Sequence, residues 1–471
     1  MHMHLKSNTM TSRMHTYFLI QTMLLVGATT GFLFDVNDCM TGNVCECTKT
    51  MISCHNRGLI DVPHFNITGT NISIRTLDFS YNDIYTLRNG AFSVLWNLTT
   101  TSLNVFFNGN NISTIDSLCF EELKNVIVYL DLGYNSLQTI PVAISTLTHL
   151  NKLILYGNSI IYFDPNVLFR ICNTLQRLVI SLAKVNSWPH ELHFLYNLRD
   201  LEIYNFSANM IRASDFRYMT QMPSLQTFII QHTDLEEFPA PFCDLSSVFF
   251  LNLDFNNFTG GKDIFSACHR PLANISTLSL RYNKLEYFPD LGVAFFATNE
   301  LYLSHNNIRY ITDELTAMPL LKELGLDYNK LYHIPSTLAS IAPNLQRLFV
   351  SNNLIIEINN DALGGLSNLS WLDLTGNPLE YIAEHAFSHN PYLTYLFIYN
   401  TKLITIPCAM SNNFNQFISV YPDQLIECDC RMKCLKNINL SKISFNDGRC
   451  LQTGISIDLF IEYVIKADKC G

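Results

Sequence analysis

The sequence predicts an α/β solenoid shaped as a horseshoe, with short parallel strands on its concave face and an irregular or short helical convex side. Three observations support this prediction. Leucines recur in one spacing along the 471-residue chain, asparagine recurs at one position of that spacing, and cysteines cluster at both ends. Internal repeats let a long chain fold as one array, because each repeat contacts only its neighbours.

The repeat has the form L-x-x-L-x-L-x-x-N-x-L, as in Leu321, Leu324, Leu326, Asn329 and Leu331. Its x-L-x-L-x segment alternates with period two, which predicts a short strand with inward leucines. The asparagine position, here called the Asn slot, recurs at 82, 110, 135, 158, 183, 206, 233, 256, 283, 306, 329, 353, 377 and 401. These 14 slots are 23 to 28 residues apart, a spacing typical of leucine-rich repeats, and ten of them hold asparagine.

An inward asparagine can bond backbone groups of its own coil and of the neighbouring coil that would otherwise be buried without partners. Ala183 and Phe206 cannot do this, so we expect local irregularity around these two coils. Thr233 and Thr401 can substitute weakly through a hydroxyl group.

The two cysteine clusters resemble the end caps of extracellular leucine-rich-repeat proteins, a group that includes matrix proteoglycans, axon-guidance ligands and Toll-type receptors. The first is Cys39-x5-Cys45-x-Cys47-x6-Cys54, followed by Gly58-Leu59-Ile60-Asp61-Val62-Pro63; the second is Cys428-Asp429-Cys430 with Cys450 and Cys470. An end coil needs a cap because it would otherwise expose its leucines and its strand edge. The resemblance implies an N-terminal cap over 39–66, about fourteen repeats over 67–410 and a C-terminal cap over 411–471.

The same resemblance implies disulfides between Cys39 and Cys47, Cys45 and Cys54, Cys428 and Cys450, and Cys430 and Cys470. The second cluster departs from the family pattern, because it lacks the usual tryptophan and has an added Cys434, which suggests a further bridge to Cys408. In the middle of the chain, Cys243 and Cys268 have similar phase in adjacent coils and are expected to pair. Cys119 and Cys172 are two coils apart and are expected to remain reduced and buried.

The N-terminus has the features of a secretory signal over residues 1–31: Lys6 and Arg13, an apolar run from Tyr17 to Val26, and small residues after it. The alternative is that this segment is an uncleaved anchor. Nine Asn-x-Ser/Thr sequons predict glycosylation in the secretory route, at Asn66, Asn71, Asn97, Asn111, Asn205, Asn257, Asn274, Asn368 and Asn439. We therefore expect a secreted, extracellular glycoprotein without a membrane anchor.

No catalytic, cofactor or metal motif is evident in the sequence, so no cofactor is predicted and the chain is not expected to be an enzyme. The segment from His190 to His193 has H-E-x-H spacing, which misplaces the second histidine for a zinc site on a helix. The net charge of −10 argues against nucleic acid, whose phosphates need clustered lysine and arginine.

Aromatic residues between the inward leucines near the C-terminal end are predicted to face outward on the concave surface and to contact a partner. They are Tyr302, Phe349, Trp371, Tyr395, Phe397 and Tyr399. A second outward stripe, less polar than a solvated face should be, comprises Phe106, Ile154, Val179 and Ile229. Charge on this face is mixed, so no strongly charged ligand is implied, and a glycan at Asn205 would shield the middle of the arch.

Two functions follow from the sequence. The first is an extracellular binding protein that recognises a protein or glycan through the concave face, in matrix, immune or developmental recognition. The second is a non-catalytic subunit or inhibitor in a secreted enzyme complex, because the C-terminal region also faintly resembles secreted arthropod relatives of the shrimp luciferase non-catalytic subunit. A stable stoichiometric partner would favour the second, and weak reversible capture would favour the first. The sequence does not identify the partner.

Overall fold

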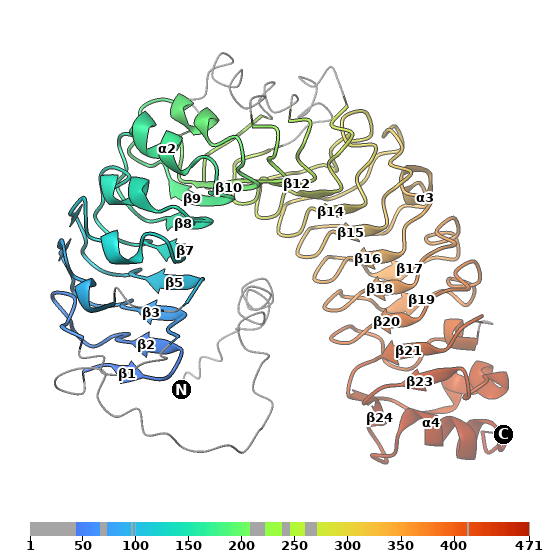
Figure 1. The fold of residues 1–471 in the computed structure, drawn as a ribbon. Helices are drawn as coiled ribbons and strands as arrows, with labels where there is room; N and C mark the ends of the chain where they lie inside the picture. Colours follow the sequence, from blue (N-terminus) through green and yellow to red (C-terminus); the bar gives the residue numbers. More distant parts are fainter. Residues whose placement is uncertain are drawn as a thin grey trace, which may run out of the picture.

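The chain forms an arch of stacked coils whose strands line the inner side, as the computed structural model shows (Figure 1). The structure describes residues 44–65, 73–95, 98, 100–207, 222–237, 245–259, 271–411 and 414–470. The predicted fold class is confirmed: short parallel strands form the concave face, and turns and short helices form the convex side.

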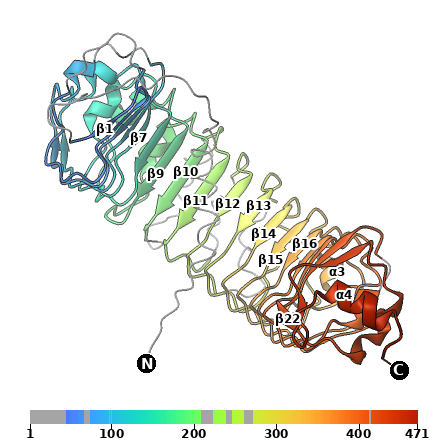
Figure 2. The same ribbon diagram turned by 90° about the horizontal axis from the view of Figure 1, so that it is seen from below.

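An 18-stranded sheet runs the length of the arch, and its strands lie side by side in chain order (Figure 2). Its strands are β1 (Glu46–Cys47), β2 (Met51–Ser53), β3 (Thr76–Asp78), β5 (Leu103–Phe106), β7 (Ile127–Asp131), β8 (Lys152–Leu155), β9 (Arg177–Ser181), β10 (Asp200–Tyr204), β11 (Thr227–Gln231), β12 (Phe250–Asn252), β13 (Thr277–Ser279), β14 (Glu300–Tyr302), β15 (Glu323–Gly325), β16 (Arg347–Phe349), β18 (Trp371–Asp373), β20 (Tyr395–Phe397), β21 (Ile418–Tyr421) and β23 (Ile443–Phe445). Three two-stranded sheets pair β4 (Thr86–Leu87) with β6 (Thr114–Ile115), β17 (Glu357–Ile358) with β19 (Tyr381–Ile382), and β22 (Leu425–Ile426) with β24 (Arg449–Cys450).

The sheet continues beyond the segment 67–410 that the sequence assigned to repeats. Strand β2 pairs in parallel with β3 at the N-terminal end, and β21 and β23 extend the parallel sheet at the C-terminal end. Strand β1 runs antiparallel to β2 and covers its outer edge. Both expected caps therefore include strands of the main sheet.

Short helical segments interrupt the remaining, irregular part of the coils. The α-helices are α2 (Pro165–Ile171), α3 (Leu338–Ile341) and α4 (Ile457–Phe460), and a π-helix η10 (Ile461–Ile465) follows α4. The 3-10 helices are η1 (Ser93–Leu95), η2 (Glu121–Leu123), η3 (Val142–Thr146), η4 (His190–Phe194), η8 (Cys408–Ser411) and η9 (Cys430–Asn437). In α2, the longest α-helix among the described residues, Asp164 caps the first turn by accepting from the Asn166 amide, and Pro165 supplies a preset φ.

Inward leucines meet across each pair of neighbouring strands and form the core. Leu324 is fully buried and stands opposite Leu301 on one side and Leu348 on the other. The same register persists through β9, β10 and β11. Every coil therefore buries its apolar side chains against the coils before and after it, as a solenoid requires.

Asparagines in the Asn slots connect each coil to the one before it. The side-chain Nδ2 of Asn329 donates to the backbone carbonyls of Leu326 (3.0 Å) and Leu303 (2.9 Å). Its Oδ1 accepts from the backbone amide of Ile308 (3.0 Å). Eight further asparagines make the same three bonds: Asn82, Asn110, Asn135, Asn158, Asn283, Asn306, Asn353 and Asn377. Asn256 also bonds two carbonyls, but its Oδ1 accepts from the amide of the slot residue Thr233. These bonds satisfy buried backbone groups that no strand reaches.

The expected irregularity at Ala183 and Phe206 is present and is confined to the corners, since the strand register there is unbroken. The Val185 amide donates to the Leu182 carbonyl in a tight turn. In a regular coil, the amide at this position donates to the asparagine in the next Asn slot. Phe206 is buried and packs edge-on against Trp188, with ring centroids 5.8 Å apart. An apolar contact therefore replaces the polar one at this corner. The threonines keep part of the network: Thr233 donates its hydroxyl to Asn256 Oδ1, and Thr401 to the Ile398 carbonyl.

Disulfides lie near both ends of the arch. Cys45 is joined to Cys54 at the N-terminal end; at the C-terminal end Cys408 is joined to Cys434, Cys428 to Cys450, and Cys430 to Cys470. These are pairs that the sequence analysis expected. Cys47 is also disulfide-bonded, whereas Cys39, Cys243 and Cys268 lie outside the described residues. Cys119 and Cys172 are buried free thiols, as predicted, and burial raises the pKa of the Cys119 thiol.

Two substitutions in one coil test this register. Leu324→Ala should lower the free energy of unfolding by about 2–5 kcal/mol, because it empties a fully buried site. Asn329→Ala should lower it by about 1–3 kcal/mol, because it leaves buried backbone groups unpaired. Lys330→Ala, next to Asn329 but exposed, is the matched control and should change it by less than about 0.5 kcal/mol. Equal urea midpoints for all three variants would contradict the register.

Candidate binding face on the concave sheet

Five aromatic side chains from neighbouring strands form one cluster at the C-terminal end of the concave face. The Trp371 ring centroid lies 4.8 Å from those of both Tyr395 and Phe397, and 6.1 Å from that of Phe349. Phe397 in turn stacks on Tyr421, with centroids 4.4 Å apart and planes 8° apart. We call Phe349, Trp371, Tyr395, Phe397 and Tyr421 the aromatic cluster.

Strand register explains why these rings meet. Trp371 stands directly opposite Tyr395 in the parallel pairing of β18 with β20, and Phe397 stands opposite Tyr421 in that of β20 with β21. Alternation places these side chains on the face opposite the buried leucines. Tyr395 is 38% exposed, and the other four rings are half-buried. The cluster is therefore an apolar surface on the inside of the arch.

Two of the six predicted residues do not join the cluster. Tyr302 is separated from Phe349 by Gly325, which stands opposite both in the register. Its hydroxyl donates to Glu323 Oε1 (2.8 Å), and the Arg281 guanidinium lies 4.1 Å from its ring centroid. Burial raises the pKa of Tyr302, and so does the nearby Glu323 carboxylate. Tyr399 is 44% exposed and makes no ring contact with any described residue.

One member of the cluster, Tyr421, was missed by the sequence analysis. It lies on β21, within the segment 411–471 that was assigned to the cap rather than to the repeats. The alternation of Ile418 and Val420 inward with Ser419 and Tyr421 outward is visible in the sequence and could have identified it.

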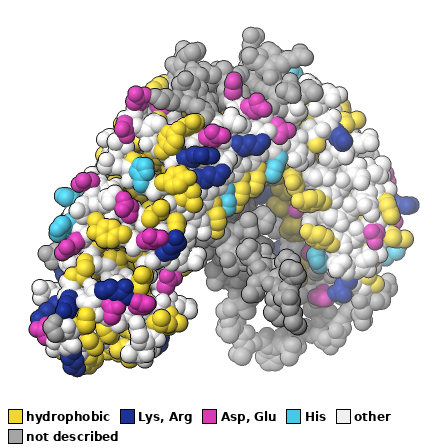
Figure 3. All heavy atoms as spheres, turned by 180° about the vertical axis from the view of Figure 1, so that it is seen from behind, with side chains coloured by type: hydrophobic (Ala, Val, Ile, Leu, Met, Phe, Trp, Pro, Cys, Tyr) yellow, Lys and Arg dark blue, Asp and Glu magenta, His cyan; other side chains and the backbone are white. Residues whose placement is uncertain are grey.

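Two ion pairs between described residues join neighbouring strands of the concave sheet. Arg347 pairs with Glu323 beside the aromatic cluster, and Arg177 pairs with Glu202 in the middle of the arch. Acidic and basic side chains are also interspersed over the face seen from behind (Figure 3). The expectation of mixed charge on the concave sheet is consistent with these pairs.

Several aspartates on this sheet are held below the surface by hydroxyl and amide donors. Asp254 accepts from the Ser279 hydroxyl (2.6 Å) and the Arg281 amide (2.7 Å). Burial nevertheless raises the pKa of Asp254 to about 6, and burial likewise raises that of Asp131 to about 6. Burial also raises the pKa of Asp327 and of Asp373. These carboxylates accept hydrogen bonds from the protein itself, so we assign them a structural role and not a ligand-binding one.

A second row of rings lies at the rim of the sheet, where each coil turns into its Asn slot. The residue before the slot has a positive φ of 50° to 75° in every coil except the one at Leu182. Five consecutive coils place rings at this corner: His232, Phe255, Tyr282, His305 and Tyr328. Neighbouring centroids are 4.8, 4.3, 4.2 and 4.2 Å apart, with interplanar angles of at most 21°. We call these five residues the ring ladder; burial lowers the pKa of its His305.

The sequence analysis did not identify the ring ladder. Its members all occupy the position directly before an Asn slot, which is readable from the repeat. The left-handed corner that aligns them is a backbone conformation, which the spacing of the leucines and asparagines does not specify.

The ladder predicts an unusual order of substitution effects at Tyr328. Both Tyr328→Ala and Tyr328→Gly remove the ring stack, but only alanine retains a Cβ at φ 53°. Tyr328→Gly should therefore be the more stable variant, by about 1 kcal/mol in the free energy of unfolding. At Lys330, which lacks a positive φ, the order should reverse. Chemical denaturation of the four variants checks this, and a less stable Tyr328→Gly would count against a left-handed corner.

The predicted glycosylation sites are distributed around the arch. Asn111, Asn205, Asn274 and Asn439 are exposed, Asn257 and Asn368 are partly exposed, and Asn66, Asn71 and Asn97 lie outside the described residues. Asn205 occupies a left-handed corner at the rim, and Asn368 precedes β18 on the flank.

Of the second predicted stripe, Val179 is buried in the sheet, and the Phe106 ring packs on that of Tyr129, with centroids 5.1 Å apart.

No cluster of metal-binding side chains occurs within the described ranges. His190 and His193 both lie on the short 3-10 helix η4, and the His193 ring packs against Phe194. Among the same residues, none of the helices has the length and apolar character needed to cross a bilayer.

Comparison with known proteins supports the repeat and the fold. The leucine rich repeat family model matches residues 104–160, 319–379 and 343–403. The lumicans of Gallus gallus and Coturnix japonica are each 29% identical over 214 residues, which is 42% of this chain and 57% of theirs. The chain thus spans little more than half the length of these relatives. An LRR protein of Leptospira interrogans has the same fold, with a TM-score of 0.51 at 22% identity over 74% of this chain and 90% of its own.

Repeat spacing, asparagine network, strand order and these matches agree with one another. The chain is therefore a solenoid of leucine-rich repeats with disulfides near both ends.

Proposed function

We propose that this chain is a secreted extracellular protein that binds a protein or glycan partner through the C-terminal part of its concave face. The aromatic cluster is the observation that carries this proposal. Its five rings form a contiguous apolar surface on the inner side of the arch, where the core has no need of them. Rigidly held aromatic side chains are the residues that most often dominate binding energy at interfaces.

An extracellular location is supported by the disulfides, which persist in oxidising compartments, and by the similarity to lumican over part of the chain. The signal-like segment and the sequons of the sequence add to this support. We further propose that the two disulfide-bonded ends act as caps of the type found in extracellular leucine-rich-repeat proteins. The antiparallel β1 over β2 and the packing of η10 against η9 would then shield the terminal coils.

The proposed role is recognition and not catalysis. Charges of both signs along the sheet, with ion pairs at Arg177–Glu202 and Arg347–Glu323, favour a partner that is not strongly charged. The aromatic surface lies on strands whose inward leucines pack in the core. It is therefore preformed, and binding needs little reorganisation. The relation to luciferase subunits remains a prediction from sequence.

Alanine substitution in the aromatic cluster tests the proposal. The immobilised wild-type chain is used to capture a partner from native extracellular fluid, and mass spectrometry identifies it. Trp371→Ala and Tyr395→Ala should each abolish capture of that partner while the thermal midpoint barely changes, because outward side chains contribute little to the core between coils.

The matched control is Phe169→Ala, which removes an aromatic that is 63% exposed on helix α2, away from the sheet. Asn205→Gln removes the sequon at the rim. Both control variants should capture the partner as the wild type does. Normal capture by both cluster variants would refute the assignment of this surface, as would loss of capture that coincides with unfolding.

A further inference from the structure

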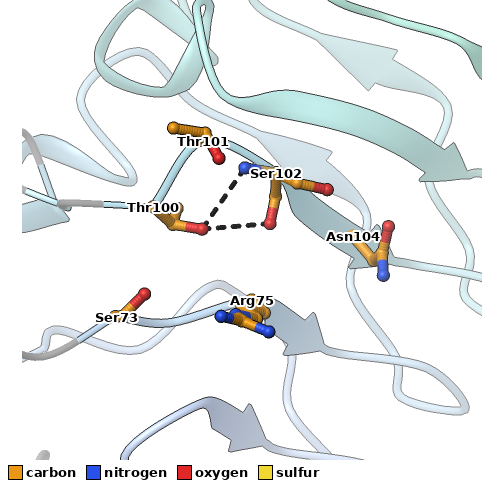
Figure 4. A pocket seen from close by; sticks show the side chains of 6 residues that line it. All are labelled: Ser73, Arg75, Thr100, Thr101, Ser102 and Asn104. Carbon is orange, nitrogen blue, oxygen red and sulfur yellow. Dashed lines mark hydrogen bonds between the residues drawn. The ribbon is translucent and has the colours of Figure 1, made fainter.

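A polar pocket opens at the N-terminal limb, at the far end of the arch from the aromatic cluster (Figure 4). It lies where the chain enters β3 and β5, and its volume is about 430 Å³. Six residues line it: Ser73, Arg75, Thr100, Thr101, Ser102 and Asn104. The proposed function does not use this pocket, and no sequence motif predicted it.

The side chains in the pocket offer more hydrogen-bond donors than the protein itself uses. Thr100 is committed: its hydroxyl donates to the Ser102 carbonyl (3.0 Å) and accepts from the Ser102 amide (3.3 Å). The hydroxyls of Ser73, Thr101 and Ser102 and the side-chain amide of Asn104 have no hydrogen-bond partner among the described residues. The pocket therefore presents four neutral polar groups to whatever occupies it.

Arg75 adds a positive charge to these groups. Its guanidinium has neither an ion-pair nor a hydrogen-bond partner within the part of the chain that the structure describes, and none of the six lining residues is acidic. This contrasts with Arg177 and Arg347 on the same sheet, which are paired with glutamates. The register sets Arg75 close to Asn104, because Thr76, the next residue, stands opposite Asn104.

We propose that this pocket binds a sulfate ester group, as carried by a sulfated sugar. An oxyanion with several acceptor oxygens matches a guanidinium surrounded by hydroxyl and amide donors. One unpaired cation among neutral donors balances a monoanionic sulfate ester. A phosphate monoester carries −1.5 to −2 charges near neutral pH and would leave part of its charge unbalanced. The volume also leaves room for part of the attached sugar ring.

Calorimetric titration of the full chain with N-acetylglucosamine 6-sulfate, at constant ionic strength, tests the proposal. Wild type should bind the sulfated sugar saturably and should bind unsulfated N-acetylglucosamine at least tenfold more weakly. Arg75→Gln should weaken binding of the sulfated sugar roughly tenfold or more, because it removes the charge-assisted hydrogen bonds. Ser102→Ala should weaken it less; Ser73 is left unchanged because it completes the Asn71 sequon.

Trp371→Ala is the control that separates this site from the aromatic cluster and should bind the sulfated sugar as wild type does. Arg75 is exposed, so the Arg75→Gln protein should keep the wild-type thermal midpoint. The proposal is overturned by an absence of saturable binding, by equal affinity of wild type and Arg75→Gln, or by equal affinity for the unsulfated sugar. Tighter binding of N-acetylglucosamine 6-phosphate than of the sulfate would overturn the ligand class.

Discussion

The whole arch depends on satisfying backbone groups at the corners, where the chain leaves one strand and no neighbouring strand can reach it. Strand pairing and leucine packing account for the sheet and the core, but they leave carbonyls such as those of Leu303 and Leu326 and amides such as that of Ile308 inside the protein. In each of the ten coils that have one, the slot asparagine bonds two such carbonyls and one such amide. Because an unpaired buried polar group costs about 1–3 kcal/mol, repetition of this residue stabilises the fold in addition to the leucines.

Surface features of the molecule follow from the same constraint. The residue before the slot takes a left-handed conformation in nearly every coil, also before Phe206, Thr233 and Thr401, and this corner aligns Phe255, Tyr282 and His305 in a stack along the rim. Successive strands also stay in register, including at the coils of Ala183 and Phe206. Outward residues on β18 and β20 therefore stand opposite one another, and Trp371 meets Tyr395. A repeat selected by backbone chemistry thus produces ordered rows of side chains that a partner can contact.

Much of this could be predicted from the sequence because its causes are local and repeated. The strands, the inward leucines and the asparagine network follow from spacing, and the outward position of Trp371 follows from alternation. What could not be predicted depends on individual residues between the pattern positions. Gly325 separates Tyr302 from Phe349, and the expected single patch becomes a cluster with Tyr302 and Tyr399 outside it. The Arg75 pocket depends on loop residues that precede the strands, where the repeat imposes no pattern.

Backbone amide hydrogen exchange of the native chain, resolved to single amides, tests the role of the asparagine network most directly. Ile308 and Ile160 are equivalent positions, both buried, two residues after an Asn slot. The Ile308 amide donates to Asn329, whereas the Ile160 amide faces the coil of Ala183 and has no acceptor among the described residues. The account predicts slow exchange at Ile308, with Leu331 and Ile355 alike, and faster exchange at Ile160. Equal protection at Ile160 and Ile308 would contradict it.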